Sequence, residues 1–254
     1  MIFVTGDLHG AHEIHKLKRK AFPFGRRLAK EDFVVILGDF GLIWEPKEPA
    51  VRALWDQNPP PDDTTEQERF WLGFLSEQPW TTLFIDGNHE NFDRLMEYPV
   101  EDFHGGKAAR IHDTVWYLRR GEIFELCNTT CFVMGGAASI DKQWREPGRT
   151  WWPQELPTPE DLENAHRNLS LHNDAVDLVF THTCPRSIKE QLPLYGHLGN
   201  VGEKRGFDDP TEDMLEGLFA SLRFDHWYFA HFHLDHAVNE RFTSVFDHVV
   251  RVAD

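Results

Sequence analysis

The chain contains five apolar runs of strand length, and each run stops abruptly at a small residue beside Asp, Asn or His. Continuous apolar runs of this length are typical of strands that are buried on both faces. A chain that repeats this pattern has to cover both faces of a sheet, which favours an α/β architecture. The runs are Ile2–Thr5, Phe33–Leu37, Thr82–Ile85, Asp177–Phe180 and Trp227–Phe229.

Helical patterns lie between these runs. The segment Thr64–Gln78 places apolar side chains at helical spacing. Thr158 and Asp209 each precede a proline, as residues at helix N-caps often do. The alternation of strand and helix patterns supports the α/β prediction.

Further strand patterns occupy the middle and the end of the chain. Val115–Leu126 and Cys131–Met134 are predicted strands, and Arg241–Val252 has the pattern of a strand pair. We therefore expect a second sheet packed against the first, with helices outside, in a single domain spanning residues 1–254. The polar or Gly/Pro-rich stretches Pro59–Asp63 and Gly196–Gly206 are predicted surface loops.

Polar clusters stand directly after all five runs. In open α/β sheets, ligands bind beyond the carboxyl ends of the strands, because the loops converge there. We therefore expect these side chains, which are far apart in the sequence, to meet at one edge of one sheet. They are Asp7, His9, Asp39, Asn88, His89, His182, His231 and His233.

These residue types form a coherent set of metal ligands. Carboxylate and carboxamide oxygens suit hard cations, imidazoles suit first-row transition metals, and the set contains no thiolate. This mixture favours Mn, with Fe, Zn or Mg as alternatives. Seven of these eight side chains as ligands would exceed what one tetrahedral site uses. We therefore expect two divalent ions sharing a bridging carboxylate, an arrangement that activates water for attack on a phosphate.

The same clusters resemble the motifs of the calcineurin-like metallophosphoesterase family, and the likeness extends from residue 6 to residue 233. The resemblance implies a four-layer α/β/β/α sandwich of two mixed β-sheets flanked by helices. The block from Gly135 to Lys142 is similar to that of a small bacterial and phage-type subgroup. The family motifs here are Gly6-Asp7-Leu8-His9-Gly10, Gly38-Asp39, Gly87-Asn88-His89-Glu90, Thr181-His182 and Ala230-His231-Phe232-His233.

The resemblance also implies a role for each site residue. Asp39 would bridge the two ions, and His89 would be the catalytic general acid near the leaving group, with a role as metal ligand as its alternative. The implied ligands of one ion are Asp7, His9 and His233. Those of the other ion are Asn88, His182 and His231.

Two departures from the family pattern narrow the substrate. Protein Ser/Thr phosphatases of this superfamily place Arg before the Gly-Asn-His-Glu motif and an Asp-Arg pair soon after the second motif. Here Asp86 precedes Gly87, and the segment Phe40–Trp44 follows Asp39. These differences count against a protein phosphatase and favour a phosphodiester or nucleotide-type substrate.

Two residues after Gly135 are candidate substrate contacts. Arg145 could bind the phosphate, and the alternative is a solvated surface charge. Trp152, with its neighbour Trp151, could stack on a base. Large aromatic side chains more often pack a loop onto the domain, so packing is the favoured interpretation of both tryptophans.

Charge and composition restrict the partners and the compartment. The formal net charge of −16 makes general nucleic-acid binding unexpected, although two bound cations would still allow a phosphate substrate. No stretch is apolar enough to span a membrane, and the N-terminus has no basic leader. An odd number of cysteines, Cys127, Cys131 and Cys184, favours reduced thiols. A soluble, cytoplasmic protein is expected.

The predicted function is hydrolysis of a small phosphorylated substrate by a hydroxide that bridges two metal ions. The alternatives within the same chemistry are a phosphomonoesterase or a protein phosphatase. A non-catalytic metal-binding scaffold of the same fold is the alternative from another class. The complete ligand set and the presence of His89 favour the enzyme. The oligomeric state and the natural substrate have no signature in the sequence.

Overall fold

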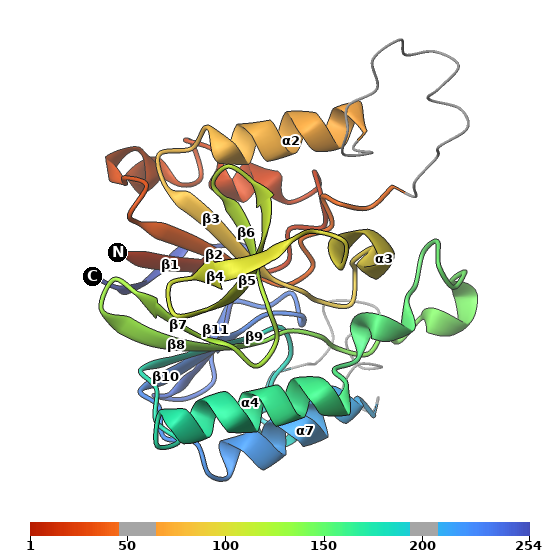
Figure 1. Ribbon diagram of the computed structural model, residues 1–254, viewed down its shortest axis with the longest axis vertical. Coiled ribbons are helices and arrows are strands. Elements are labelled where there is room, and N and C mark those ends of the chain that lie inside the picture. The colour runs from red at the N-terminus through yellow and green to blue at the C-terminus, as the bar shows by residue number, and fades with distance from the viewer. Residues whose placement is uncertain (46–64, 194–207) are drawn as a thin grey trace.

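A computed structural model of the chain describes residues 1–45, 65–193 and 208–254 (Figure 1). The predicted loops Pro59–Asp63 and Gly196–Gly206 lie outside the described residues, as does Thr64 at the start of the first predicted helix. None of the helices in the described ranges is both long enough and apolar enough to cross a bilayer. The three cysteines are free thiols, as predicted.

The first sheet has seven strands in the order β13-β1-β2-β3-β6-β5-β4. Its centre, β1-β2-β3-β6, is parallel, and β13, β5 and β4 run antiparallel to their neighbours. The parallel strands are buried throughout or nearly so, as continuous apolar runs require. The strands are β1 (Ile2–Thr5), β2 (Phe33–Leu37), β3 (Thr81–Ile85), β4 (Val100–Phe103), β5 (Gly106–His112), β6 (Val115–Leu118) and β13 (Val250–Ala253).

The second sheet has six strands in the order β11-β12-β10-β9-β8-β7. Here β12, β10, β9 and β8 are parallel, and the edge strands β11 and β7 are antiparallel. The strands are β7 (Ile123–Leu126), β8 (Thr129–Met134), β9 (Leu178–Thr181), β10 (His226–Phe229), β11 (His236–Ala237) and β12 (Phe242–Ser244).

Side chains cap three of the helices at their N-termini, and the caps at Thr158 and Asp209 were predicted. The hydroxyl of Thr65 accepts the backbone N–H of Glu68 at the start of α2, and Thr158 and Asp209 cap α4 and α7 in the same way. The α-helices are α2 (Glu66–Ser76), α3 (Phe92–Leu95), α4 (Pro159–Leu171), α5 (Arg186–Lys189) and α7 (Pro210–Phe219). The 3₁₀ turns are η1 (Ile14–Leu17), η2 (Pro23–Arg27), η3 (Lys142–Trp144) and η4 (Pro153–Glu155).

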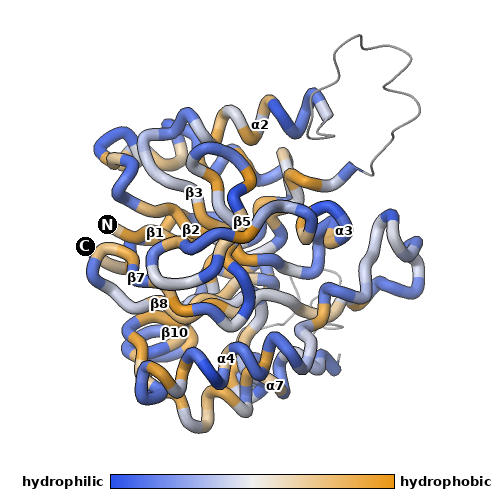
Figure 2. The backbone as a smooth tube through the Cα atoms, in the orientation of Figure 1, coloured by the Kyte–Doolittle hydropathy of each residue, from blue (hydrophilic) through white to orange (hydrophobic). Residues whose placement is uncertain are grey.

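Three apolar cores separate four layers. One core lies between α2 and the first sheet, the second lies between the two sheets, and the third lies between the second sheet and the pair α4 and α7 (Figure 1). The strands are mainly hydrophobic, whereas α2 and α4 alternate hydrophilic with hydrophobic residues (Figure 2). The predicted α/β/β/α sandwich of two mixed sheets is confirmed. The single-domain assignment stays a prediction.

Three details of the strand prediction were wrong. Val115–Leu126 is not one element, because β6 joins the first sheet and β7 the second. Arg241–Val252 is not a strand pair, because β12 and β13 also lie in different sheets. The five motif-bearing strands likewise do not share a sheet: β1, β2 and β3 belong to the first, and β9 and β10 to the second. Strands of both sheets are buried alike, so hydrophobicity alone does not tell the sheets apart.

Candidate metal centre

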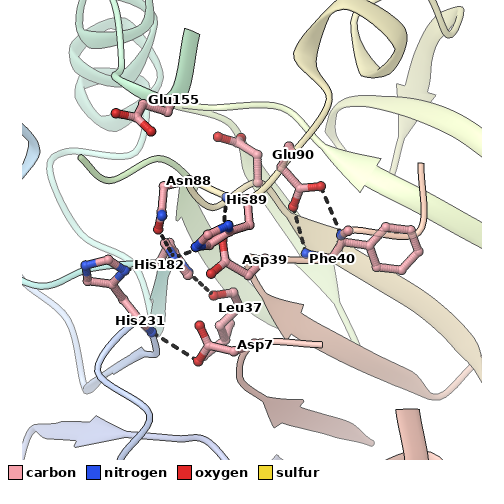
Figure 3. A network of polar contacts seen from close by, with 12 residues as sticks. Asp7, Leu37, Asp39, Phe40, Asn88, His89, Glu90, Glu155, His182 and His231 are labelled. Atoms are coloured by element: carbon pink, nitrogen blue, oxygen red, sulfur yellow. Dashed lines mark hydrogen bonds and ion pairs between the residues drawn. The ribbon is translucent and has the colours of Figure 1, made fainter. Parts of the chain in front are cut away.

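The eight predicted strand-end side chains converge beyond the carboxyl ends of strands from both sheets, and Figure 3 shows six of them: Asp7, Asp39, Asn88, His89, His182 and His231. Each follows the strand that the sequence indicated, and a continuous set of short contacts joins them. His231 contacts Asp7 and His182, and His182 contacts Asn88 and Asp39. The remaining three, His9, His89 and His233, contact Asp39 or one another. The edge that gathers them belongs to two sheets, not to one.

Asp39 lies at the centre of the cluster. Its Oδ1 is 3.4 Å from Nε2 of His182 and accepts the backbone N–H of His89 at 2.8 Å. Its Oδ2 is 3.7 Å from Nε2 of His9. The two oxygens of one buried carboxylate therefore face two different groups of ligands, which is the arrangement that a bridging role requires.

The imidazole of His182 is oriented for metal binding. Its Nδ1 lies 2.7 Å from the carbonyl oxygen of Leu37, which can only accept, so Nδ1 carries the proton. The lone pair of Nε2 then points at acceptor oxygens, 3.2 Å from Oδ1 of Asn88 and 3.4 Å from Oδ1 of Asp39. Nδ1 of His231 also lies 3.2 Å from Nε2 of His182. Two carbonyl-type oxygens and two imidazole nitrogens that converge in this way offer ligand atoms for a cation.

The donor set fits divalent cations. Three groups of side chains bring their ligand atoms within 4.8 Å of one another. Oδ1 of Asp7 is buried without a hydrogen-bond partner, and Nε2 of His9 lies 3.0 Å from Nε2 of His233. The three groups are Asp7, His9, His233; His9, Asp39, His89; and Asp7, Asp39, His182.

The electrostatics of the two aspartates differ. Burial raises the pKa of Asp7. Burial acts in the same direction on Asp39, but the surrounding histidines, with His182 first, hold the pKa of that carboxyl well below its ordinary value. Two buried carboxylates at such close range repel when both are ionised, and a bound cation removes that repulsion.

Five of the cluster residues have positive φ angles, a conformation that non-glycine residues rarely adopt. Asp7, His9 and Asp39 have φ of 25°, 44° and 48°, and His231 and His233 have 67° and 51°. Strained backbone of this kind is retained at functional sites, where the surrounding structure holds it. These five are half of the ten non-glycine residues with positive φ in the described parts of the chain, and the family resemblance implies all five as ligands.

Glycine is needed beside two of the ligands. A Cβ atom at Gly87 would overlap the carboxylate of Asp39, and one at Gly38 would overlap the ring of His182. Gly38 also has a φ of 93°, which favours glycine. Both positions were singled out in the sequence as glycines next to metal-binding motifs.

Asn88 has a support that the sequence analysis missed. Its Nδ2 donates to Oγ of Ser139 at 3.1 Å, and the Ser139 hydroxyl donates to Oε2 of Glu155 at 2.5 Å. The backbone N–H of Ser139 donates to the other oxygen of Glu155. Because Ser139 uses its proton on Glu155, it can only accept from Asn88, which keeps the Oδ1 of Asn88 turned toward His182 (Figure 3).

Replacing Ser139 by alanine should therefore weaken metal binding roughly 10- to 100-fold, the usual cost of losing a group that orients a metal ligand. Competition with a chromogenic chelator measures the metal Kd, and a thermal melt on the same preparation records stability. Ser170→Ala, on the exposed side of α4, is the matched control. An unchanged metal Kd in Ser139→Ala would show that Asn88 needs no such support.

Lys16 is a second missed support. Its side chain is buried, and Nζ donates to the carbonyl oxygens of Gly6, Asp7 and Phe246 at 2.8, 2.9 and 2.7 Å. All three protons of the ammonium group are used. The ring of Phe246 stacks on His233, with ring centroids 4.5 Å apart. Lys16 thus ties the loop after β1 to the loop before β13.

Glu90 holds the loop that carries Asp39. Its two carboxylate oxygens accept the backbone N–H groups of Phe40 and Gly41 at 2.7 and 3.1 Å (Figure 3). Burial raises the pKa of Glu90 well above its ordinary value. The motif after β3 therefore supplies both a ligand and the support of another ligand's loop.

Asp86, which departs from the protein phosphatase pattern before Gly87, has a structural role. Its carboxylate accepts from the hydroxyl of Tyr117 at 2.7 Å and from Nε and Nη2 of Arg120 at 2.9 and 2.5 Å. Both partners are buried. In this position the chain carries an internal ion pair where the protein phosphatases carry a phosphate-binding arginine.

Arg145 lies beside the cluster, and its contact with a substrate stays a prediction. Its Nη1 is 3.1 Å from Nδ1 of His89, and its Nε donates to Asp141 at 2.7 Å. A guanidinium can only donate, so Nδ1 of His89 accepts in the shorter contact, and Nη2 of Arg145 lies 3.5 Å from Nε2 of the same ring. Burial lowers the pKa of His89 to about 4; Arg145 adds to the shift and Asp39 opposes it.

Trp152 does not face the cluster as an exposed stacking surface. It is 2% exposed, its indole N–H donates to Asp93 at 2.8 Å, and its ring packs edge-on against Trp44. The packing interpretation of this tryptophan agrees with these contacts. A contact of Trp152 with a substrate stays a prediction.

Comparison with known proteins agrees with this geometry. A search of curated proteins finds no match to the chain. The family model described as calcineurin-like phosphoesterase matches residues 1–235 of the 254. The match spans all five motifs, whose side chains meet in one cluster of metal-binding type. The chain belongs to the calcineurin-like phosphoesterase family.

Proposed function

We propose that the chain hydrolyses phosphate esters with two divalent metal ions, Mn in the first place and Fe, Zn or Mg as alternatives. The observation that carries this proposal is the position of Asp39, whose two oxygens face different ligand groups. Family membership supports a metal-dependent phosphoester hydrolase. Bound divalent ions lower the pKa of water and neutralise charge on a phosphate.

The site residues fall into two ligand groups and a set of residues that orient them. Asp39 holds the two ligand groups together, with Asp7, His9 and His233 on one side. Asn88, His182 and His231 complete the other side. Leu37, Glu90 and Ser139 keep these side chains in their orientations.

His89 and Arg145 serve the substrate in this proposal. His89 protonates the leaving oxygen, and Arg145, next to its ring, binds a phosphate oxygen. Arg145 belongs to the segment 141–151. The phosphate-binding arginines of protein phosphatases stand elsewhere, before the Gly-Asn-His-Glu motif and soon after the second motif. That difference supports a phosphodiester or nucleotide-type substrate over a phosphoprotein.

Assay of the purified chain with generic nitrophenyl phosphate esters tests the function. Turnover of a diester or monoester that rises with Mn and is abolished by a chelator is the expected result. Tight metal binding without turnover on a broad panel of nucleotides, cyclic nucleotides, diesters and phosphopeptides would instead identify a non-catalytic scaffold. Preference for phosphopeptides would overturn the proposed substrate class.

Arg145→Ala should lower kcat/KM by roughly 10- to 100-fold, because one charge-assisted hydrogen bond to the phosphate is lost. Metal content and melting temperature should stay near those of the unaltered chain. Arg149→Ala is the matched control, since Arg149 lies in the same segment and is exposed. Equal kinetic constants for the two variants would show that Arg145 does not bind the substrate.

A further inference from the structure

A pocket of about 510 Å³ adjoins the metal centre, and the proposed roles in metal and phosphate binding leave most of its lining residues without a function. Its inner end is formed by His9 and His89, which belong to the metal cluster. From there it extends between the loop after β2 and the first turns of α2. Trp44 and Trp71 line it, and Thr65 and Gln67 stand at its polar end. An ester bound at the cluster would place one substituent in this pocket.

Both tryptophans are held in place by their neighbours. The backbone N–H of Trp44 donates to Glu68 at 2.9 Å, its carbonyl accepts from Asn91 at 2.8 Å, and its ring packs edge-on against Trp152. Trp71 makes edge-on contacts with its neighbours Phe70 and Phe74, and both tryptophans are only half-buried. Fixed and partly exposed indoles offer an aromatic surface without the entropic cost of ordering it.

Among the described residues that line the pocket, none is Lys or Arg, so none of them would hold a second anionic group by a permanent positive charge. Lys18 lies close by, with Nζ 5.0 Å from the centre of the Trp71 ring, but it does not line the pocket. The carboxylate of Glu68 is neutralised by Arg94 at 2.6 Å and accepts further backbone N–H groups. This lining fits an uncharged group better than a phosphate chain.

We propose that the pocket binds a planar, uncharged aromatic substituent of the phosphate ester, such as an aryl group or a nucleobase. The proposal rests on the proposed function, because it assumes that the phosphate sits at the metal cluster. Stacking against an aromatic side chain does not depend on which base or aryl ring is bound, and it raises affinity roughly tenfold or more. A polyphosphate tail is the occupant that this lining excludes.

Inhibition by three anions tests the proposal on the Mn-loaded chain. Benzylphosphonate and methylphosphonate share the anionic head and differ by one ring, and pyrophosphate adds a second anionic group. Each anion is tested for inhibition of hydrolysis, with the nitrophenyl ester that the chain turns over as the substrate. Benzylphosphonate should inhibit at least about tenfold more tightly than methylphosphonate. Equal inhibition by these two, or tightest inhibition by pyrophosphate, overturns the proposal.

Variants locate the effect in the pocket. Trp71→Leu should narrow the ratio between the two phosphonates, and Trp71→Phe should keep part of it. Trp144→Leu, which alters a tryptophan that is 78% exposed on another segment, should leave the ratio unchanged. Gln67→Arg changes an exposed position of α2 and should strengthen inhibition by pyrophosphate, which provides a test should Trp71→Leu fail to fold. The assignment of Trp71 and Gln67 to the binding pocket would be contradicted by either of two results. One is an unchanged ratio of the two phosphonate inhibition constants in a folded Trp71→Leu, and the other is unchanged inhibition by pyrophosphate in Gln67→Arg.

The two failures can be told apart. If no ester is turned over, the proposed function fails, and calorimetric titration of the Mn-loaded chain with the same three anions still measures the preference. If esters are turned over without a preference for the benzyl group, only the assignment of the pocket fails.

Discussion

Replacing Asp39 by asparagine should reduce the metal content of the chain at both halves of the centre and lower hydrolysis by more than about 100-fold. Loss of a residue that merely orients a ligand costs 10- to 100-fold, so loss of a shared ligand should cost more. The carboxamide has one acceptor oxygen in place of two and carries no charge. It cannot serve the side of His9 and the side of His182 together.

Elemental analysis under metal-replete conditions measures this effect, with hydrolysis recorded on the same preparations. Asp177→Asn is the matched control, because that aspartate also stands beside a strand, at the start of β9 in the second sheet, but binds Thr130 and lies outside the metal-binding groups. It should keep close to two ions per chain. One ion per chain in the unaltered protein, unchanged in Asp39→Asn, would contradict the two-metal proposal.

His89→Asn should leave the metal content intact and slow hydrolysis of esters with poor leaving groups by about 10²- to 10⁴-fold, the usual contribution of a general acid. A nitrophenolate needs little protonation to depart. The same variant should therefore lose much less activity on a nitrophenyl ester than on an alkyl ester of similar shape, provided that chemistry limits both rates.

Metal analysis separates the two roles considered for His89. Its ring belongs to one of the metal-binding groups, together with His9 and Asp39. A variant that lacks one ion would identify His89 as a ligand, and equal losses on both esters would argue against proton transfer to the leaving group.

The acid role of His89 depends on the substrate complex. In the free chain, burial lowers the pKa of His89 to about 4, so the ring is neutral at pH 7. A phosphate anion bound beside the ring would raise that pKa, because an opposite charge favours the protonated form. The corresponding titration is therefore expected in the pH profile of kcat, which reports the substrate complex, at a higher pH than in that of kcat/KM.

The sequence by itself determined most of the strands and helices and the side chains that meet in the cluster. Runs such as Phe33–Leu37 and caps such as Thr158 act locally, through burial on both faces and through a hydrogen bond three residues ahead. Each predicted site residue also follows its strand directly, so its position at a strand end needed no knowledge of distant contacts. For the same reason the glycines at positions 38 and 87 could be recognised beside the motifs.

Only the tertiary structure decided which sheet each strand joins and which side chains support the centre. The hydrogen bond from His182 to the carbonyl of Leu37 joins residues 145 positions apart, and Ser139 reaches Asn88 across 51 positions. Arg145 and Trp152 lie close in sequence, yet one reaches His89 and the other packs against Trp44. Such outcomes depend on how the two sheets pack against each other. Local periodicity carries no information about that packing, because a buried strand has the same pattern in either sheet.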